Sequence, residues 1–500
     1  MSVHQIIFTS CRRGISGGGD GKQIYSQDAA FQGADGEELR HLFSYHPPDP
    51  GCPMTDALAQ TMPQAYKYQR LRSGAQALAL NTYLGRDYMG ETGRFGNHLS
   101  HVIVCDAQDM TAYPAEYYGG EFFRSGMTFE EVNSPDLPPI LPVPVLKRCF
   151  VVAVVAVADF LSKEGHMDIY KQMLCAMLSF ERTGKRVVIL DEPENIILWI
   201  AALGYALPKQ NAMEINFSTY EYAPARALAR VCGTVRDGTE LGDENQYFVF
   251  DILGRNIPSW ELDPMFFGFI NVAFSFPCED LWNFHDFLSD GYDYGKADED
   301  FYGAYALYTV LADGPGSVSE EQLSLALNFA GRFARENETL RIVRLLVEAD
   351  AGIAVKLLEA FAVNAVRLTD MALTLEIFLP DSPEEMRETV WDRFGTIILS
   401  RCPASVEEVY ILLSKHGRLN RAYQLYRLAL SEASGPEECD AVYRGHDRAL
   451  IQADPKYAAL YGAKVQDSYQ ATRNGFPGAP VRTGSSIFQN IANLFKRRRS

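Results

Sequence analysis

Long apolar runs and paired cysteines are missing from this sequence. The longest apolar run, residues 150–158, is far shorter than the roughly 18–20 residues of a membrane-spanning helix. The N-terminus shows no basic segment followed by an apolar one, so no signal peptide is expected. The nine cysteines are scattered and form no CxxC pair, which favours reduced thiols over a disulfide framework. We therefore expect a soluble cytoplasmic protein.

Basic residues are fewer than acidic ones. The 500 residues contain 46 Lys and Arg against 64 Asp and Glu, which gives a formal net charge of -18. Because phosphate backbones are bound by Lys and Arg, this balance argues against nucleic acid as the main partner. The chain is 47% apolar and 12% aromatic, so its bulk is globular, and its length fits roughly three domains.

A complete phosphate-binding loop is also missing. Residues 187–193, VVILDEP, resemble the acidic strand that binds Mg²⁺ in transport-type ATPases, but those enzymes also need a GxxxxGK[ST] loop. The nearby Gly184 and Lys185 lack the other glycine and the Ser or Thr, and the glycine-rich stretch 14–21 leads into a predicted strand. We expect the acids at 191–192 to lie at a helix start, and we expect neither a P-loop NTPase nor a bound cofactor.

The first 140 residues predict a mixed α+β module with antiparallel pairing. β-branched and aromatic residues, alternating with polar ones in places, predict two hairpins and one further strand. The expected strands cover residues 3–10, 22–31, 65–72, 75–84 and 98–105. A short helix is expected over 35–45 with Asp35 as its N-cap. Five prolines between 135 and 144 indicate an extended linker that ends the module.

The stretch richest in reactive side chains is GRFGNHLSHVIV, residues 93–104. Two glycines frame a turn, polar and titratable residues follow, and the stretch ends as an apolar strand that would present a site at its edge. Because side chains alternate along a strand, His98 and Ser100 share one face and His101 lies on the other. The candidate residues are Asn97, His98 and His101 for catalysis, and Arg94 and Ser100 for binding.

Cys11 is the candidate nucleophile of a possible thiol hydrolase. It follows the first strand and is flanked by two arginines, and neighbouring cations lower the pKa of a thiol. Either histidine would be the base, oriented by Asn97 or Asp106. This set matches a Cys/His/Asn site in residue types only, and it requires the strands of Cys11 and His101 to be neighbours.

Residues 145–260 predict an α/β middle domain, and residues 261–470 are almost wholly helical. In the middle domain, helices are expected over 145–164, 166–182 and 194–207, and strands over 186–191, 212–220, 228–235 and 246–253. One helix of the C-terminal region is expected to begin at Ser319 as N-cap. Cys439 and His446 are two helical turns apart, but two ligands do not make a metal site, so none is expected. The fold class is multidomain α+β, with an all-helical C-terminal region.

Residues 471–500 predict a flexible linker and an amphipathic helix with a basic end. The tail residues expected to make contacts are Ile487, Ile491, Phe495 and Arg497. Such a helix docks on a partner protein or lies weakly on an anionic membrane, and we favour the partner. The alternative is a solvated terminal tail.

The order of several segments is similar to that of a known family. HQIIFTS, a glycine loop, KQIYSQDAAF, YKYQRL, GRFGNHLSHVIV and INFSTYEY resemble the bacterial GTPase-associated protein family, first component, with a type-two N-terminal module. The resemblance covers roughly residues 1–260. It implies a GTPase encoded nearby and other protein partners in predicted bacterial conflict or antiviral defence systems, and it supplies no catalytic residue.

Two hypotheses about function follow. The first is an adaptor or regulatory component of a GTPase-linked bacterial defence system, acting through protein–protein contacts and not as an enzyme. The alternative is that the N-terminal module is a cysteine/histidine-dependent hydrolase.

Overall fold

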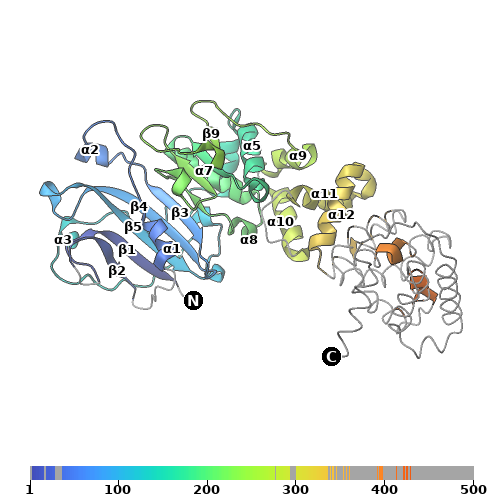
Figure 1. Ribbon diagram of the computed structural model, residues 1–500, viewed down its shortest axis with the longest axis horizontal. Helices are drawn as coiled ribbons and strands as arrows, with labels where there is room; N and C mark the ends of the chain where they lie inside the picture. Colours follow the sequence, from blue (N-terminus) through green and yellow to red (C-terminus); the bar gives the residue numbers. More distant parts are fainter. Residues whose placement is uncertain are drawn as a thin grey trace, which may run out of the picture. The chain divides into compact units, whose positions relative to one another are not determined.

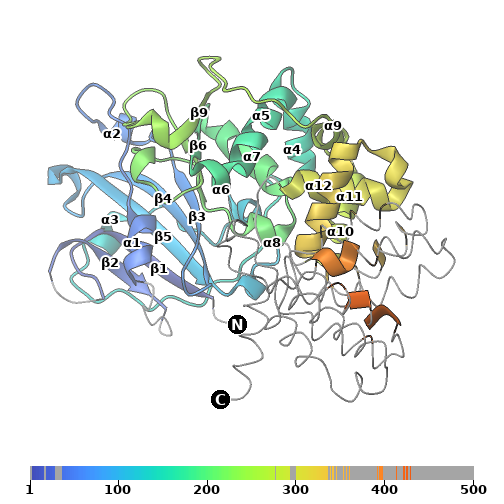
Figure 2. The same ribbon diagram turned by 45° about the vertical axis from the view of Figure 1, so that its right-hand side comes forward.

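The computed structural model describes residues 3–15, 19–28, 36–275, 277–292 and 300–335, with isolated positions between 338 and 428 (Figures 1 and 2). The chain forms two compact units, Met1–Asp286 with Gly295–Phe301, and Phe287–Tyr294 with Tyr302–Ser500. No helix in the described part of the chain is long and apolar enough to cross a bilayer.

The first unit contains one nine-stranded sheet, and its first five strands are antiparallel. They follow the order β2-β1-β5-β4-β3, so the two expected hairpins are confirmed and the strands of Cys11 and His101 are neighbours. The bounds are β1 His4–Cys11, β2 Gly21–Gln27, β3 Ala65–Arg70, β4 Gln76–Arg86 and β5 Phe95–Cys105. A bulge near Gly85 interrupts the β4–β5 pairing, and Gly85 adopts a φ of 81°.

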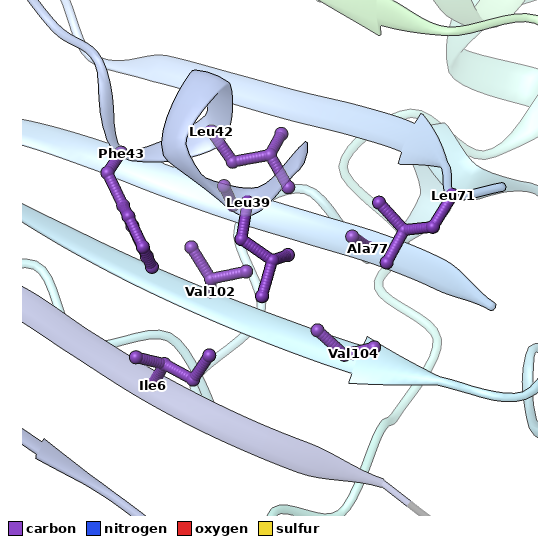
Figure 3. Packing of buried hydrophobic residues seen from close by; sticks show 9 residues of the cluster. Ile6, Leu39, Leu42, Phe43, Leu71, Ala77, Val102 and Val104 are labelled. Carbon is purple, nitrogen blue, oxygen red and sulfur yellow. The ribbon is translucent and has the colours of Figure 1, made fainter. Parts of the chain in front are cut away.

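Helix α1, Gly36–Phe43, covers one face of these strands (Figure 3). Leu39 and Leu42 point from α1 onto Val102 and Val104 of β5, in a cluster that also includes Ile6. Both leucines are almost fully buried, which contributes roughly 1.5–3 kcal/mol each. The helix lies where the sequence predicts it, while its expected N-cap at residue 35 is outside the described residues.

The other four strands of the sheet are parallel and follow the order β7-β8-β6-β9. They are β6 Arg186–Leu190, β7 Phe217–Ser218, β8 Val231–Thr234 and β9 Tyr247–Asp251. Helices α5 His166–Leu178 and α7 Pro193–Tyr205 lie against them, with α5 contacting β6 and α7 contacting β8, and α4 Val154–Leu161 packs on α5 and α7 (Figure 2). The short helices are α2 Asp56–Ala59, α3 Phe129–Val132, α6 Phe180–Thr183 and α8 Lys209–Ala212.

Two expected elements of the middle region are shorter than the sequence predicts. The helix expected over 145–164 begins only at Val154. The residues before it are hydrogen-bonded to the N-terminal module, because Cys149 donates its N–H to Glu116 O over 2.7 Å. The strand expected over 212–220 is reduced to β7. The residues that lead into β7 are bound by a side chain of β3, since Tyr68 donates its hydroxyl to Met213 O over 2.7 Å.

Strand β3 joins the two halves of the sheet by pairing antiparallel with β7. The proline-bearing segment 139–142 lies along the outer edge at β2. Leu141 donates its N–H to Gln27 O over 3.3 Å, and Gln5 of β1 donates its amide to Pro142 O over 2.5 Å. The predicted linker is therefore extended and hydrogen-bonded to the N-terminal strands.

The remaining described elements are helical, as expected. They are α9 Pro264–Ala273, α10 Glu279–Gly291, α11 Asp300–Asp313 and α12 Glu320–Phe333. Ser319 caps α12 by accepting the N–H of Gln322 over 3.2 Å, and the Gln322 amide accepts the N–H of Ser319 over 3.0 Å. The multidomain α+β fold class is confirmed. Cys439, His446 and the tail residues Ile487, Ile491, Phe495 and Arg497 lie outside the described residues.

Candidate functional site

His98 and Ser100 lie on the α1 face of β5, as the alternation predicts. Both donate to the carbonyl oxygen of Phe43 at the end of α1, His98 from Nε2 over 2.8 Å and Ser100 from its hydroxyl over 3.1 Å. The rings of Phe8 and Tyr45 flank the imidazole. Burial, reinforced by the charge of nearby Lys22, lowers the pKa of His98 to about 4. His98 is therefore a neutral side chain that binds the end of α1.

His101 lies on the opposite face and uses both ring nitrogens. Nε2 donates to Gln5 Oε1 over 2.7 Å, and Nδ1 accepts the backbone N–H of Arg124 over 2.8 Å. These two bonds fix the Nε2–H tautomer. Burial and the neighbouring Arg124 lower the pKa of His101 to about 4. The imidazole thus ties the loop at residue 124 to the sheet.

Asn97 and Cys11 also have structural roles. Asn97 supports the pairing of β1 with β5, and Cys11 packs in the core against these strands. Asn97 Oδ1 accepts the N–H of Ser10 over 3.1 Å and the hydroxyl of Thr9 over 3.3 Å. Cys11 is fully buried beside Leu99. Burial raises the pKa of the Cys11 thiol to about 11, although hydrogen bonds from Arg13 and Gln23 act in the opposite direction. The expectation of a lowered thiol pKa is therefore wrong, because the effect of burial is larger than that of these hydrogen bonds.

The structure does not bring the candidate nucleophile to a candidate base. His101 pairs with Ile7, and Cys11 lies four residues farther along β1, a separation of about 13 Å. His98 is on the other face of the sheet. Arg94 is exposed in the turn between β4 and β5, where its carbonyl accepts the N–H of Asp87.

Asp191, from the acidic VVILDEP stretch, lies at the start of α7. Its Oδ1 accepts the N–H of Glu192 over 2.8 Å, and its Oδ2 accepts the indole N–H of Trp199 over 2.8 Å. Both carboxylate oxygens therefore fix the helix start, in agreement with the expected role of these acids.

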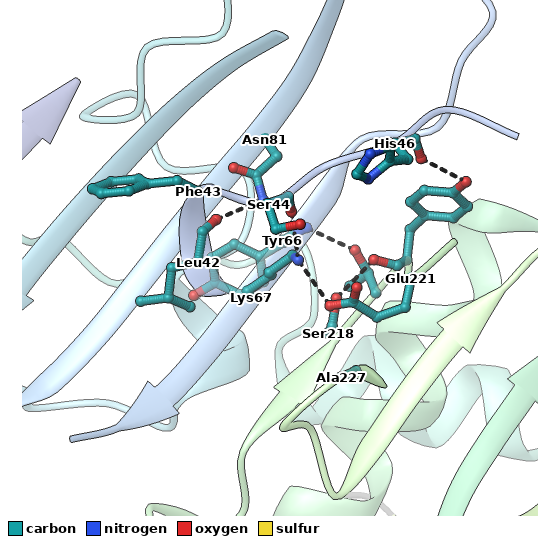
Figure 4. A network of polar contacts seen from close by, with 12 residues as sticks. Leu42, Phe43, Ser44, His46, Tyr66, Lys67, Asn81, Ser218, Glu221 and Ala227 are labelled. Atoms are coloured by element: carbon teal, nitrogen blue, oxygen red, sulfur yellow. Dashed lines mark hydrogen bonds and ion pairs between the residues drawn. The ribbon is translucent and has the colours of Figure 1, made fainter. Parts of the chain in front are cut away.

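Figure 4 shows the polar contacts of Lys67 and Glu221, where the two halves of the sheet meet. A cavity of about 230 Å³ lies there, on the α1 face. We call it the junction cavity. It is lined by residues 41, 42 and 44–46, by β3 at 67–69, by residues 216–218, 220–223 and 226–229, and by Glu240. The buried Lys67 Nζ lies 2.8 Å from Glu221 Oε1 and donates to Ser44 O over 2.9 Å. The only mark of this site in the sequence is a lysine between the two tyrosines of β3, which by itself predicts no site.

Charged side chains of both signs line the junction cavity, since Lys67 and Arg226 lie there with Glu221 and Glu240. His46 and Arg226 are exposed there, and the ring of His46 lies 5.9 Å from that of Tyr222. Burial lowers the pKa of His46, and the charges of Lys22, Lys67 and Arg226 lower it further against the weaker opposing effect of Glu221. In the described part of the chain, no group of three His, Cys, Asp or Glu side chains could hold a metal ion.

Comparison with protein-family models identifies two domains. Residues 2–143 match GTPase-associated protein 1, N-terminal domain type 2, and residues 157–254 match GTPase-associated protein 1, middle domain. Over residues 2–254 the chain belongs to the GTPase-associated protein 1 family. The suspected family and its type-two module are confirmed. No curated protein and no solved structure matches the chain.

The two candidate regions are distributed differently over these family domains. The β5 residues and Cys11 belong entirely to the GTPase-associated protein 1 N-terminal domain. The junction cavity takes Lys67 from that domain and Glu221 from the GTPase-associated protein 1 middle domain. It is the candidate site to which both domains contribute.

Proposed function

We propose that this protein is an adaptor or regulatory component of a GTPase-linked bacterial defence system, acting through protein–protein contacts in the cytoplasm. The observation that carries the proposal is the match of its first half to two domains of a family named for its association with a GTPase. The partners are a GTPase encoded nearby and other proteins of the same system.

An exposed apolar segment, residues 137–155, supplies a contact surface for the GTPase. Of the fifteen large apolar side chains that are exposed among the described residues, seven fall in this stretch, led by Phe150 at 73% and Ile140 at 71%. The seven are Leu137, Ile140, Val143, Val145, Phe150, Val151 and Val155. Concentrated exposed apolar side chains are typical of protein contact sites, and an extended proline-bearing segment loses little entropy on binding. The segment also connects the two family domains.

Co-purification tests the proposal. The tagged full chain is expected to retain the product of the neighbouring GTPase gene in at least one of the GDP-bound and GTP-bound states. An Ile140→Ser, Phe150→Ser double variant should lower retention at least tenfold. Leu253→Ser is the matched control, because Leu253 is an exposed apolar residue outside the segment. Failure to retain the GTPase in either nucleotide state would reject the proposal, and full retention by the double variant would reject this contact surface.

Two secondary proposals keep their own tests. The burial of Cys11 and its raised pKa argue against the hydrolase alternative. A Cys11→Ser variant that keeps its fold but loses the activity of the system would support that alternative again.

The C-terminal tail is proposed as a further contact with a partner protein or, weakly, a membrane. A tail fused to a fluorescent protein that spreads evenly through cells would remove the membrane version.

A further inference from the structure

We propose that the junction cavity binds a small organic oxyanion, a phosphate- or carboxylate-bearing metabolite no larger than a single ring. This inference goes beyond the proposed GTPase contact and does not depend on it. Its ligand would touch both family domains, because the walls of the cavity come from both.

The floor of the cavity supplies the anion-binding group. Lys67 is buried, and its ammonium carries three N–H donors. The described acceptors, Glu221 Oε1 and Ser44 O, receive two of them, which leaves one for a ligand. The buried Gln69, two residues along β3 on the same face, adds an amide to the same wall.

The mouth of the cavity adds a second cation. Arg226 is 84% exposed, and its 3.9 Å separation from Glu240 is the longest ion-pair distance among the described residues, so this guanidinium is easily recruited by a ligand. Burial is the main cause of the lowered pKa of His46, and the charges of Lys22, Lys67 and Arg226 add to it and outweigh the opposite effect of Glu221. A positive potential inside a concave site concentrates anions.

The size and the aromatic lining limit the rest of the ligand. A volume of about 230 Å³ is below the roughly 300–1,000 Å³ of pockets for drug-sized molecules, so the cavity encloses about a single ring with its anionic group. The rings of Tyr222 and His46 lie together at the mouth, and Tyr45 and Tyr220 form an apolar wall beside them. Such rings bind a flat apolar body.

Calorimetric titration of the full chain with three probes tests the proposal. The probes are inorganic phosphate, phenyl phosphate and benzoate, so the series separates the anionic group from the ring and phosphate from carboxylate. At least one of the ring-bearing anions should bind more tightly than inorganic phosphate. Binding should also raise the melting temperature, because the ligand binds the folded chain and not the unfolded one.

Variants locate the binding. Arg226→Ala should weaken binding about tenfold, since a hydrogen bond to a charged group is lost. Lys67→Met with Glu221→Leu removes the buried pair together, which avoids an unpaired buried charge, and should weaken binding at least as much. Arg72→Ala is the matched control, because Arg72 is 92% exposed and does not line the cavity. Absence of binding by all three probes at about 10 mM, or equal affinity in the wild type and Arg226→Ala, would overturn the proposal.

Discussion

The antiparallel and parallel halves of the sheet differ in what their strands bury. Strands β1–β5 bury twelve polar or charged side chains among 43 residues, whereas β6–β9 bury two among 16, Ser218 and Thr234. In the antiparallel half several of these side chains bond to the main chain of covering segments. His98 and Ser100 donate to Phe43 O, Asn81 donates to Leu42 O, and His101 accepts the N–H of Arg124.

The reason lies in what covers each half. A helix satisfies most of its own backbone groups, so α5 and α7 can pack on β6 and β8 through apolar side chains alone. Loops and helix ends have unpaired N–H and C=O groups, and these must find partners when they are buried. The strands beneath them supply those partners. A strand rich in histidine, asparagine and serine can therefore reflect the loops that cover it and not a catalytic site.

Acidification is expected to have the largest effect, mainly on the antiparallel half. The pKa values of His98, His101 and His285 are lowered to about 4 from 6.5 in the unfolded chain. Between these values the unfolded chain binds protons that the folded chain does not, so the free energy of unfolding falls as the pH falls. We expect a loss of about 2 kcal/mol per histidine between pH 7.5 and 5, measured by urea unfolding.

The variant His101→Gln provides the check on acidification. It should be less stable than wild type at pH 7.5 but lose about 2 kcal/mol less between the two pH values. Hydrogen exchange should show the greater acid loss in β1–β5. A pH dependence equal to that of the wild type would contradict the neutral, buried state of His101.

Removing a large apolar side chain should have the next largest effect, and it acts on the parallel half. Trp199 of α7 is fully buried, and its ring lies 4.6 Å from that of Phe160 and 5.0 Å from that of His166. Trp199→Ala should lower the free energy of unfolding by about 4 kcal/mol, because a cavity is left behind. Denaturant unfolding measures it, and Trp199→Phe should cost clearly less.

Replacing a buried polar side chain by an apolar one tests the antiparallel half directly. Gln5 accepts the Nε2–H of His101 and donates its amide N–H to Pro142 O. Gln5→Leu therefore leaves the His101 donor and the Pro142 acceptor without this partner. We expect a loss of about 2 kcal/mol, measured by denaturant unfolding. Gln64→Leu is the control, since Gln64 is exposed and should change stability by less than about 0.5 kcal/mol. A neutral Gln5→Leu would show that these strands do not need their polar side chains.

The smallest expected effect concerns the bulge in the β4–β5 pair. Gly85 has a φ of 81°, and an added Cβ would lie 3.1 Å from the Cβ of Ala59. Gly85→Ala should therefore cost about 1–2 kcal/mol of unfolding free energy, measured by thermal unfolding. Gly126→Ala meets no neighbour within 4 Å and should be nearly neutral. Equal effects at the two positions would contradict a conformational requirement at the bulge.

Local pattern predicted most of the first unit. Strand composition and alternation found both hairpins and the two faces of β5, because burial repeats every second residue. The burial of Cys11 could not be found in this way, since Leu99 and Tyr25 come from other strands. The junction cavity was missed because Lys67 and Glu221 are far apart in the sequence and meet only when β3 pairs with β7. Pairing between residues this far apart in the sequence cannot be predicted from the local pattern around either residue.

The proline-bearing segment beside β2 also protects the molecule from self-association. The outer strand of an open sheet is a template on which a second chain can add and from which aggregates grow. Here Leu141 occupies the edge at Gln27, and Pro139 and Pro142 beside it have no N–H to offer to a further strand. A full-length Pro139→Thr, Pro142→Thr variant would restore two N–H groups beside this edge, and we expect it to aggregate more readily than the wild-type chain.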